Sequence, residues 1–205
     1  DKFFSKPLNI EYDIFAIISN FGSFLAIFII FRKEIFSLLK SFFGYIFKKD
    51  LREKEKSDFK YCMAIILATI PAGIMGIIVT KLDLFKELEE DVRIIGFMLV
   101  VTSLFLYLIK DFKGSKDKEE ITYKDACKIG LYQMIALLPG ISRSGATIVG
   151  GMFQKLKRNV AFDFSFMLYM PISVATMILG VKDLLELSIS FKMMSYYFIG
   201  AFVAF

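Results

Sequence analysis

Long apolar runs, separated by short charged segments, are the feature that most constrains this chain. Most of the runs approach the ~20 residues that a helix needs to cross a bilayer. Backbone groups in lipid must be satisfied within the chain, so the runs predict helices and not open sheets. The sequence therefore predicts an all-α, polytopic membrane protein. The runs cover residues 14–31, 61–80, 94–109, 162–181 and 191–205.

The composition supports a lipid setting and excludes several classes of site. Hydrophobic residues make up 56% of the chain, against roughly 45–50% in soluble domains. The net charge of +5 lies between apolar runs and forms no stripe for nucleic acid, so we expect membrane lipids as partners and no nucleic acid. The chain has no histidine. Cys62 and Cys127 lack metal-ligand spacing, and we expect no disulfide between them.

Two stretches after the first run are harder to assign. Residues 35–47 have helical spacing but are too short to span, so they form either an interfacial helix or a continuation of the preceding one. Residues 48–60 carry dense mixed charge and are predicted to be a solvated loop.

A polar segment at residues 137–147, LLPGISRSGAT, interrupts the apolar pattern. A cation is costly at membrane depth and usually marks a functional pathway. Broken backbone is tolerated there only if it is buried or lines a cavity. The apolar segments on either side, 126–138 and 148–153, are each too short to span. We therefore expect a re-entrant helix–loop–helix hairpin at about 126–154, which the distribution of Lys and Arg among the loops also favours.

The backbone of this segment suits phosphate. Pro139 ends one helix, and Gly140 and Gly145 allow positive φ and close approach by a ligand. Residues from Ser142 onward start a second helix, whose first N–H groups are unpaired and carry the positive end of the helix dipole. Phosphate binds well at such a position.

The side chains add donors of the right kind. Arg143 offers a planar fork that matches two phosphate oxygens. Ser142, Ser144 and Thr147 can donate hydroxyl hydrogen bonds or cap the helix. The alternative is a simple Pro-Gly kink with capping serines and an Arg143 that reaches lipid headgroups. We favour the anion site because Arg143 stands between two serines.

Residues 139–147 resemble the P-G-x-S-R-S-G-x-T motif of the undecaprenyl-diphosphate phosphatase family, the bacitracin-resistance type. The resemblance covers essentially the whole chain. It implies an integral-membrane enzyme of the bacterial plasma membrane that hydrolyses undecaprenyl diphosphate, and an inverted repeat with two re-entrant hairpins. Further matching pieces are Gly22-Ser23, Pro71-Ala72, Gln133, Gly150-Gly151-Met152, Phe164-Ser165-Phe166 and Pro171.

The resemblance also implies residue roles. Arg143 would clamp the diphosphate. Ser142 and Thr147, the other catalytic residues, would donate hydrogen bonds to it. Asp163 falls where relatives often carry a carboxylate, and its role is open. The phosphate-binding loop would be completed by Gly140, Ser144 and Gly145.

The chain departs from the family in one respect. The family's second motif, with two glutamates three residues apart and a histidine, has no match here. Glu11 has no second glutamate at that spacing. Such a phosphatase needs an acid/base group and often a divalent cation, Mg²⁺ or Ca²⁺, whose ligands we expect outside this chain. We therefore expect residues 1–205 to be one membrane domain cut at both ends, inactive alone. A homodimer is also considered.

Two questions stay open. Residues 12–14 and 162–164 precede similar apolar runs, which indicates either an inverted repeat or chance similarity between apolar helices. The broken hairpin also fits a transporter that binds an anion or lipid phosphate without hydrolysis. A purely structural bundle would leave Arg143 unexplained.

Overall fold

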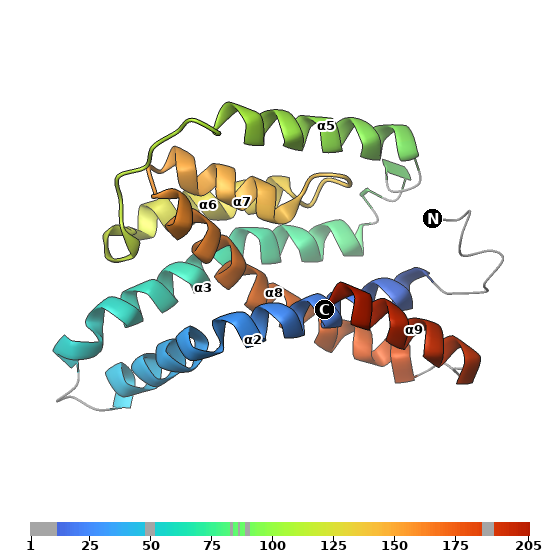
Figure 1. The fold of residues 1–205 in the computed structure, drawn as a ribbon, viewed down its shortest axis with the longest axis horizontal. Coiled ribbons are helices and arrows are strands. Elements are labelled where there is room, and N and C mark those ends of the chain that lie inside the picture. The colour runs from blue at the N-terminus through green and yellow to red at the C-terminus, as the bar shows by residue number, and fades with distance from the viewer. Residues whose placement is uncertain (1–11, 48–51, 83, 86, 89–90, 186–190) are drawn as a thin grey trace. The chain divides into compact units, whose positions relative to one another are not determined.

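A computed structural model describes residues 12–47, 52–82, 84–85, 87–88, 91–185 and 191–205 (Figure 1). This part of the chain contains helices and no strand, which confirms the all-α prediction. Each predicted apolar run lies within a helix to within a residue, although several of the helices extend well beyond the run. The helices are α2 (Tyr12–Phe47), α3 (Arg52–Lys81), α5 (Val92–Leu108), the 3₁₀ turn η2 (Lys118–Glu120), α6 (Tyr123–Ile135), α7 (Arg143–Phe153), α8 (Arg158–Leu185) and α9 (Phe191–Ala204).

The chain divides into two compact units. Residues 1–35 and 170–205 form one, and residues 36–169 form the other. The boundaries fall inside α2 and α8, so each of these helices contributes to both units. A single membrane domain and an inverted repeat both stay predictions.

Two helical segments in the described ranges are long and apolar enough to cross a membrane, Lys56–Lys81 and Arg158–Ile178. Val92–Leu108 and Ser195–Ala204 are shorter apolar helices. Large apolar side chains such as Phe97 on α5 are exposed. Exposed apolar surface of this extent is typical of a protein that contacts lipid.

The structure resolves the two uncertain stretches. Residues 35–47 continue the preceding helix as part of α2. The prediction of a loop over 48–60 is wrong from Arg52 onward, where α3 already begins. Arg, Glu and Lys are good helix formers, so a solvated charge run can also be helical. Ser41 donates to Asp58 at 3.2 Å, and the rings of Tyr45 and Phe59 stack with centroids 4.0 Å apart.

In the unit of residues 36–169, α6 packs against α3, α7 against α6, and α5 against α7 (Figure 1). Small residues make these contacts close. A Cβ placed on Gly130 of α6 would lie 2.5 Å from the carbonyl oxygen of Ala68 on α3. One placed on Gly150 of α7 would lie 2.9 Å from the Tyr132 ring on α6. The predicted hairpin is thus a packed pair of helices, while its re-entry into a membrane stays a prediction.

The other unit is built from the remaining parts of α2 and α8 with α9. Gly22 of α2 lies against the backbone of Ala201 on α9. Ser23 donates to the carbonyl of Ala204 at 3.3 Å, and Asn20 donates to Thr176 of α8 at 3.5 Å. Weakly polar side chains therefore link helices inside an apolar unit.

Candidate functional site

Helix α7 begins where the sequence predicts a second helix. Ser142 is its N-cap residue, with extended backbone at φ −68° and ψ 119°. The Ser142 Oγ accepts a hydrogen bond from the Gly145 N–H at 3.2 Å. Arg143 is the first helical residue. The Ser142 cap satisfies one of the free N–H groups that open the helix.

The turn that leads into α7 requires glycine. Helix α6 ends at Ile135, three residues before the predicted end at Leu138, and turns carry the chain to Ser142. Gly140 has φ +89°, a left-handed conformation that residues with a Cβ rarely adopt. A Cβ there would also lie 2.5 Å from the carbonyl oxygen of Ile95 on α5. Both the backbone angle and the close approach exclude larger residues.

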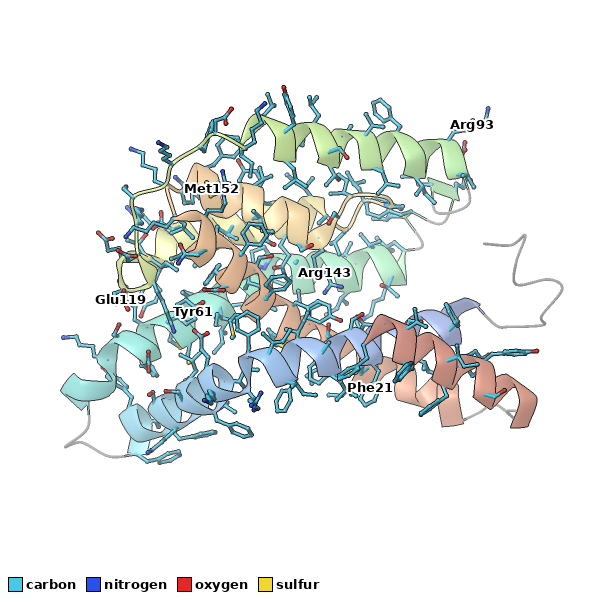
Figure 2. All side chains as sticks on the ribbon, viewed as in Figure 1. Phe21, Tyr61, Arg93, Glu119, Arg143 and Met152 are labelled. Carbon is cyan, nitrogen blue, oxygen red and sulfur yellow. The ribbon has the colours of Figure 1, made fainter. Side chains whose placement is uncertain are left out.

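Arg143 has donors that the described part of the protein does not satisfy. Its guanidinium lies over the ring of Tyr169 on α8, with Cζ 5.2 Å from the ring centroid, within the range of a cation–π interaction. Its Nη1 is buried and has no hydrogen-bond partner among the described residues. Figure 2 labels Arg143 on the side of α7 that faces away from α5. A guanidinium has five N–H donors and no acceptor, so this group is suited to an anion.

The hydroxyl groups of the motif fall into two sets. Ser142 Oγ and Ser144 Oγ lie 3.4 Å apart at the helix start, and Ser144 is exposed. Thr147 is buried one turn later, with Oγ1 3.1 Å from the carbonyl oxygens of Arg143 and Ser144. Its Oγ1 also lies 2.5 Å from Ser165 Oγ on α8. The structure therefore groups Ser142, Arg143 and Ser144 at the turn and directs Thr147 toward α8.

Three residues around the turn were given no role by sequence reasoning. Thr102 of α5 accepts the Ser142 N–H at 3.2 Å. Ser165 of α8 donates to the carbonyl of Ser144 at 3.3 Å, and Tyr169 faces Arg143. Ser165 belongs to a piece that carries the family resemblance. For Thr102 the sequence signal is only a hydroxyl within an apolar run.

Two further polar residues of the motif region lie on neighbouring helices. Gln133 of α6 is 1% exposed, and neither atom of its amide has a partner among the described residues. Asp163 is half-buried near the start of α8. No group of three or more His, Cys, Asp or Glu side chains able to hold a metal ion occurs within the described ranges.

The start of α6 is held by an ionic network. Thr122 and Asp125 form a capping box, in which each side chain accepts from the other's backbone N–H. Lys116 donates to Asp125 Oδ2 at 2.8 Å, and so does the Thr122 hydroxyl. Burial raises the pKa of Asp125, but the hydrogen bonds from Lys116 and Thr122 outweigh it, so the pKa lies below its ordinary value. This network lies outside the candidate spans.

Comparisons with known proteins cover nearly the whole chain. Residues 2–205 match the family described as bacitracin resistance protein BacA. The chain is 41% identical over 177 residues to undecaprenyl-diphosphatase 1 of Bacillus licheniformis, which covers 86% of this chain and 64% of that relative. It is 36% identical over 183 residues to undecaprenyl-diphosphatase of Acholeplasma laidlawii, covering 88% and 64%. The chain thus spans a little under two thirds of the length of these relatives.

Proposed function

Because this chain belongs to the bacitracin resistance protein BacA family, we propose that the whole protein is an integral-membrane phosphatase. It hydrolyses undecaprenyl diphosphate to undecaprenyl phosphate and phosphate, which recycles the lipid carrier of cell-wall synthesis. Relatives at 36% to 41% identity carry the name undecaprenyl-diphosphatase. The observation that carries the proposal is the buried Nη1 of Arg143, which no described residue accepts, at the start of a capped helix.

The diphosphate binds where the helix dipole and Arg143 act together. The guanidinium fork donates to two phosphate oxygens, and free N–H groups of the first turn of α7 donate to others. Ser142 and Ser144, whose hydroxyls lie at the same turn, add further donors. Gly140 and Gly145 shape this turn by packing closely against α5, where a Cβ would meet Ile95 or Thr102.

Water attacks the terminal phosphorus, and the bond from that phosphorus to the bridging oxygen breaks. The bridging oxygen keeps the electron pair and leaves on undecaprenyl phosphate. Arg143 is already fixed over Tyr169, so it stabilises the developing charge without large rearrangement. Thr147 acts in the same site through its hydrogen bonds to the backbone of the first turn of α7.

A divalent cation, Mg²⁺ or Ca²⁺, forms part of the proposal. No group of three or more His, Cys, Asp or Glu side chains that could hold it occurs among the described residues, and the proposal places its ligands and the acid/base group outside this chain. No step above depends on it. Chelation by EDTA, followed by addition of Mg²⁺ or Ca²⁺, tests the requirement in the full-length protein.

The main experiment is phosphate release from a long-chain prenyl diphosphate by the full-length protein in detergent. We expect Arg143→Ala to lower kcat/KM by roughly a hundredfold or more, as removal of one preorganised donor does elsewhere. Arg93→Ala is the matched control, because Arg93 is 94% exposed and pairs only with Asp91 among the described residues. Equal turnover by Arg143→Ala and the parent would contradict the assignment.

The same protein in vesicles tests the alternative of a carrier. If labelled lipid diphosphate crosses the bilayer without phosphate release, the proposal of a phosphatase is wrong and the protein is a transporter.

The proposed setting is the bacterial plasma membrane, crossed several times, with the hairpin of residues 126–154 entering and leaving on the cytoplasmic side. The family and the apolar helices support it. Cys127 is exposed near the start of α6, so a membrane-impermeant thiol reagent should label it only from the cytoplasmic side. A homodimer is a further proposal, tested by the mass of the protein in detergent.

A further inference from the structure

One face of α5 lies along the turn of residues 136–142, the proposed phosphate loop between α6 and α7. Ile95, Met98 and Thr102 lie at helical spacing and are less exposed than their neighbours Phe97 and Leu99. A Cβ on Gly140 would lie 2.5 Å from the Ile95 carbonyl oxygen and 3.0 Å from Met98 Cβ. The loop thus runs in direct contact with this face of α5 before it enters α7.

Thr102 holds the loop at the point where α7 begins. Its Oγ1 lies 3.1 Å from the carbonyl oxygen of Met98, to which it donates, and it accepts the Ser142 N–H at 3.2 Å. The proton of the hydroxyl is therefore directed along α5 and a lone pair toward the loop. Thr102 is buried and Ser142 is half-buried, and an N–H partly shielded from water is costly without an acceptor, so Ser142 depends on this hydroxyl.

The methyl group of the same side chain contacts the first turn of α7. A Cβ on Gly145 would lie 2.9 Å from Thr102 Cγ2. One threonine therefore touches both Ser142, the cap residue, and Gly145, whose N–H the cap accepts. The two residues that the cap hydrogen bond joins are both in contact with α5.

We infer that Thr102 is a positioning residue for the phosphate loop, and that its hydroxyl sets the orientation of Ser142 and hence of Arg143, the next residue. This inference rests on the proposed phosphatase function for its effect on catalysis. Thr102 is not one of the proposed phosphate donors. It fixes the backbone from which the phosphate donors project, and small displacements of such donors reduce rates strongly.

The test compares two substitutions that divide the functions of this side chain. Thr102→Val keeps the methyl contact and removes the acceptor for the Ser142 N–H. Thr102→Ser keeps the hydroxyl and removes the methyl group. In the full-length protein we expect Thr102→Val to lower kcat by roughly ten- to a hundredfold with a smaller change in KM. We expect Thr102→Ser to stay within about threefold of the parent, since the acceptor remains.

Ser103→Ala is the control. Ser103 is the next residue on α5, is exposed, and donates to the Leu99 carbonyl at 3.0 Å, so its substitution should leave kcat unchanged. Equal kcat for Thr102→Val and the parent would overturn the inference. So would an equal loss in Thr102→Val and Thr102→Ser, because the hydroxyl that Thr102→Ser retains would then give no protection.

Hydrogen–deuterium exchange separates this inference from the proposed function. The Ser142 amide should exchange at least tenfold faster in Thr102→Val than in the parent, and at the parent rate in Thr102→Ser. This readout requires no phosphatase activity. If Arg143→Ala kept full activity, the proposed phosphate site would be wrong, but the exchange result would still decide the role of Thr102. Unchanged exchange of the Ser142 amide in Thr102→Val would overturn that role.

Discussion

The two helices of the hairpin begin in opposite electrostatic settings. The start of α6 has Asp125 in its first turn, and that carboxylate is paired with Lys116 and with Thr122. The start of α7 has no acidic residue in its first turn and begins with Arg143 instead. Both helices have a hydroxyl N-cap, Thr122 and Ser142, so capping alone does not distinguish them.

The difference lies in what completes each helix start. Helix N-termini favour negative charge, and α6 obtains it from its own sequence. Helix α7 places a cation there and leaves Nη1 of Arg143 without a partner among the described residues. Proteins depart from such sequence preferences mainly at sites that bind or react with another molecule. The comparison supports the proposal that a ligand supplies the negative charge at α7.

The strongest test of this contrast is Arg143→Gln. Phosphate release should fall by roughly a hundredfold or more. Thermal stability should rise by about 0.5–1 kcal/mol, because a cation at the positive end of the dipole is removed. Activity and the melting temperature of the full-length protein are measured together. A fall in both would mean that Arg143 holds the fold and that the contrast with α6 is misread.

Gly140→Ala comes next, because it acts on the turn that α7 needs and α6 does not. The left-handed backbone and the contact with the Ile95 carbonyl should together cost about 2 kcal/mol of stability. Gly73→Ala on α3 is the matched control, since a Cβ there meets nothing within 4 Å, and helix propensity favours alanine. Urea unfolding measures both. Similar urea midpoints for the two variants would show that neither the backbone angle nor the contact with Ile95 excludes a side chain at residue 140.

The smallest effect is expected for Asp125→Asn. Loss of the charge should cost about 1 kcal/mol and leave phosphate release near the parent value. The pKa of Asp125 is lowered by folding, so its stabilisation is present above the unfolded value of ~3.9 and is lost as pH falls through the folded pKa. Below pH ~4, the free energy of unfolding should therefore fall less steeply with decreasing pH in the variant than in the parent. Identical acid profiles would show that the Lys116 pair contributes nothing.

Local signals were sufficient to predict the start of α7. Pro139, Gly140 and Ser142 follow known rules for ending and capping helices, so the break, the cap and the new helix could be read from neighbouring residues. The proposed role of Arg143 also rests on its place beside that cap, and it stays a prediction. Patterns within a few residues carry this information because the interactions themselves are local.

The neighbours of the loop could not be predicted in the same way. Thr102 is 40 residues from Ser142, and nothing in an apolar helix indicates which other segment it contacts. The same limit applies to Ser165 and Tyr169 on α8. The prediction of a loop over 48–60 failed for another reason: mixed charge predicts contact with water but does not exclude a helix, and α3 begins at Arg52.

The contact between α5 and the loop also bears on the order in which the protein is made. Thr102 precedes Ser142 by 40 residues, and ribosomes add about 5–20 residues per second. Helix α5 is therefore synthesised seconds before the segment that rests on it. The turn is thus made after the α5 surface on which it rests and before Ser165 and Tyr169 of α8, which contact the first turn of α7.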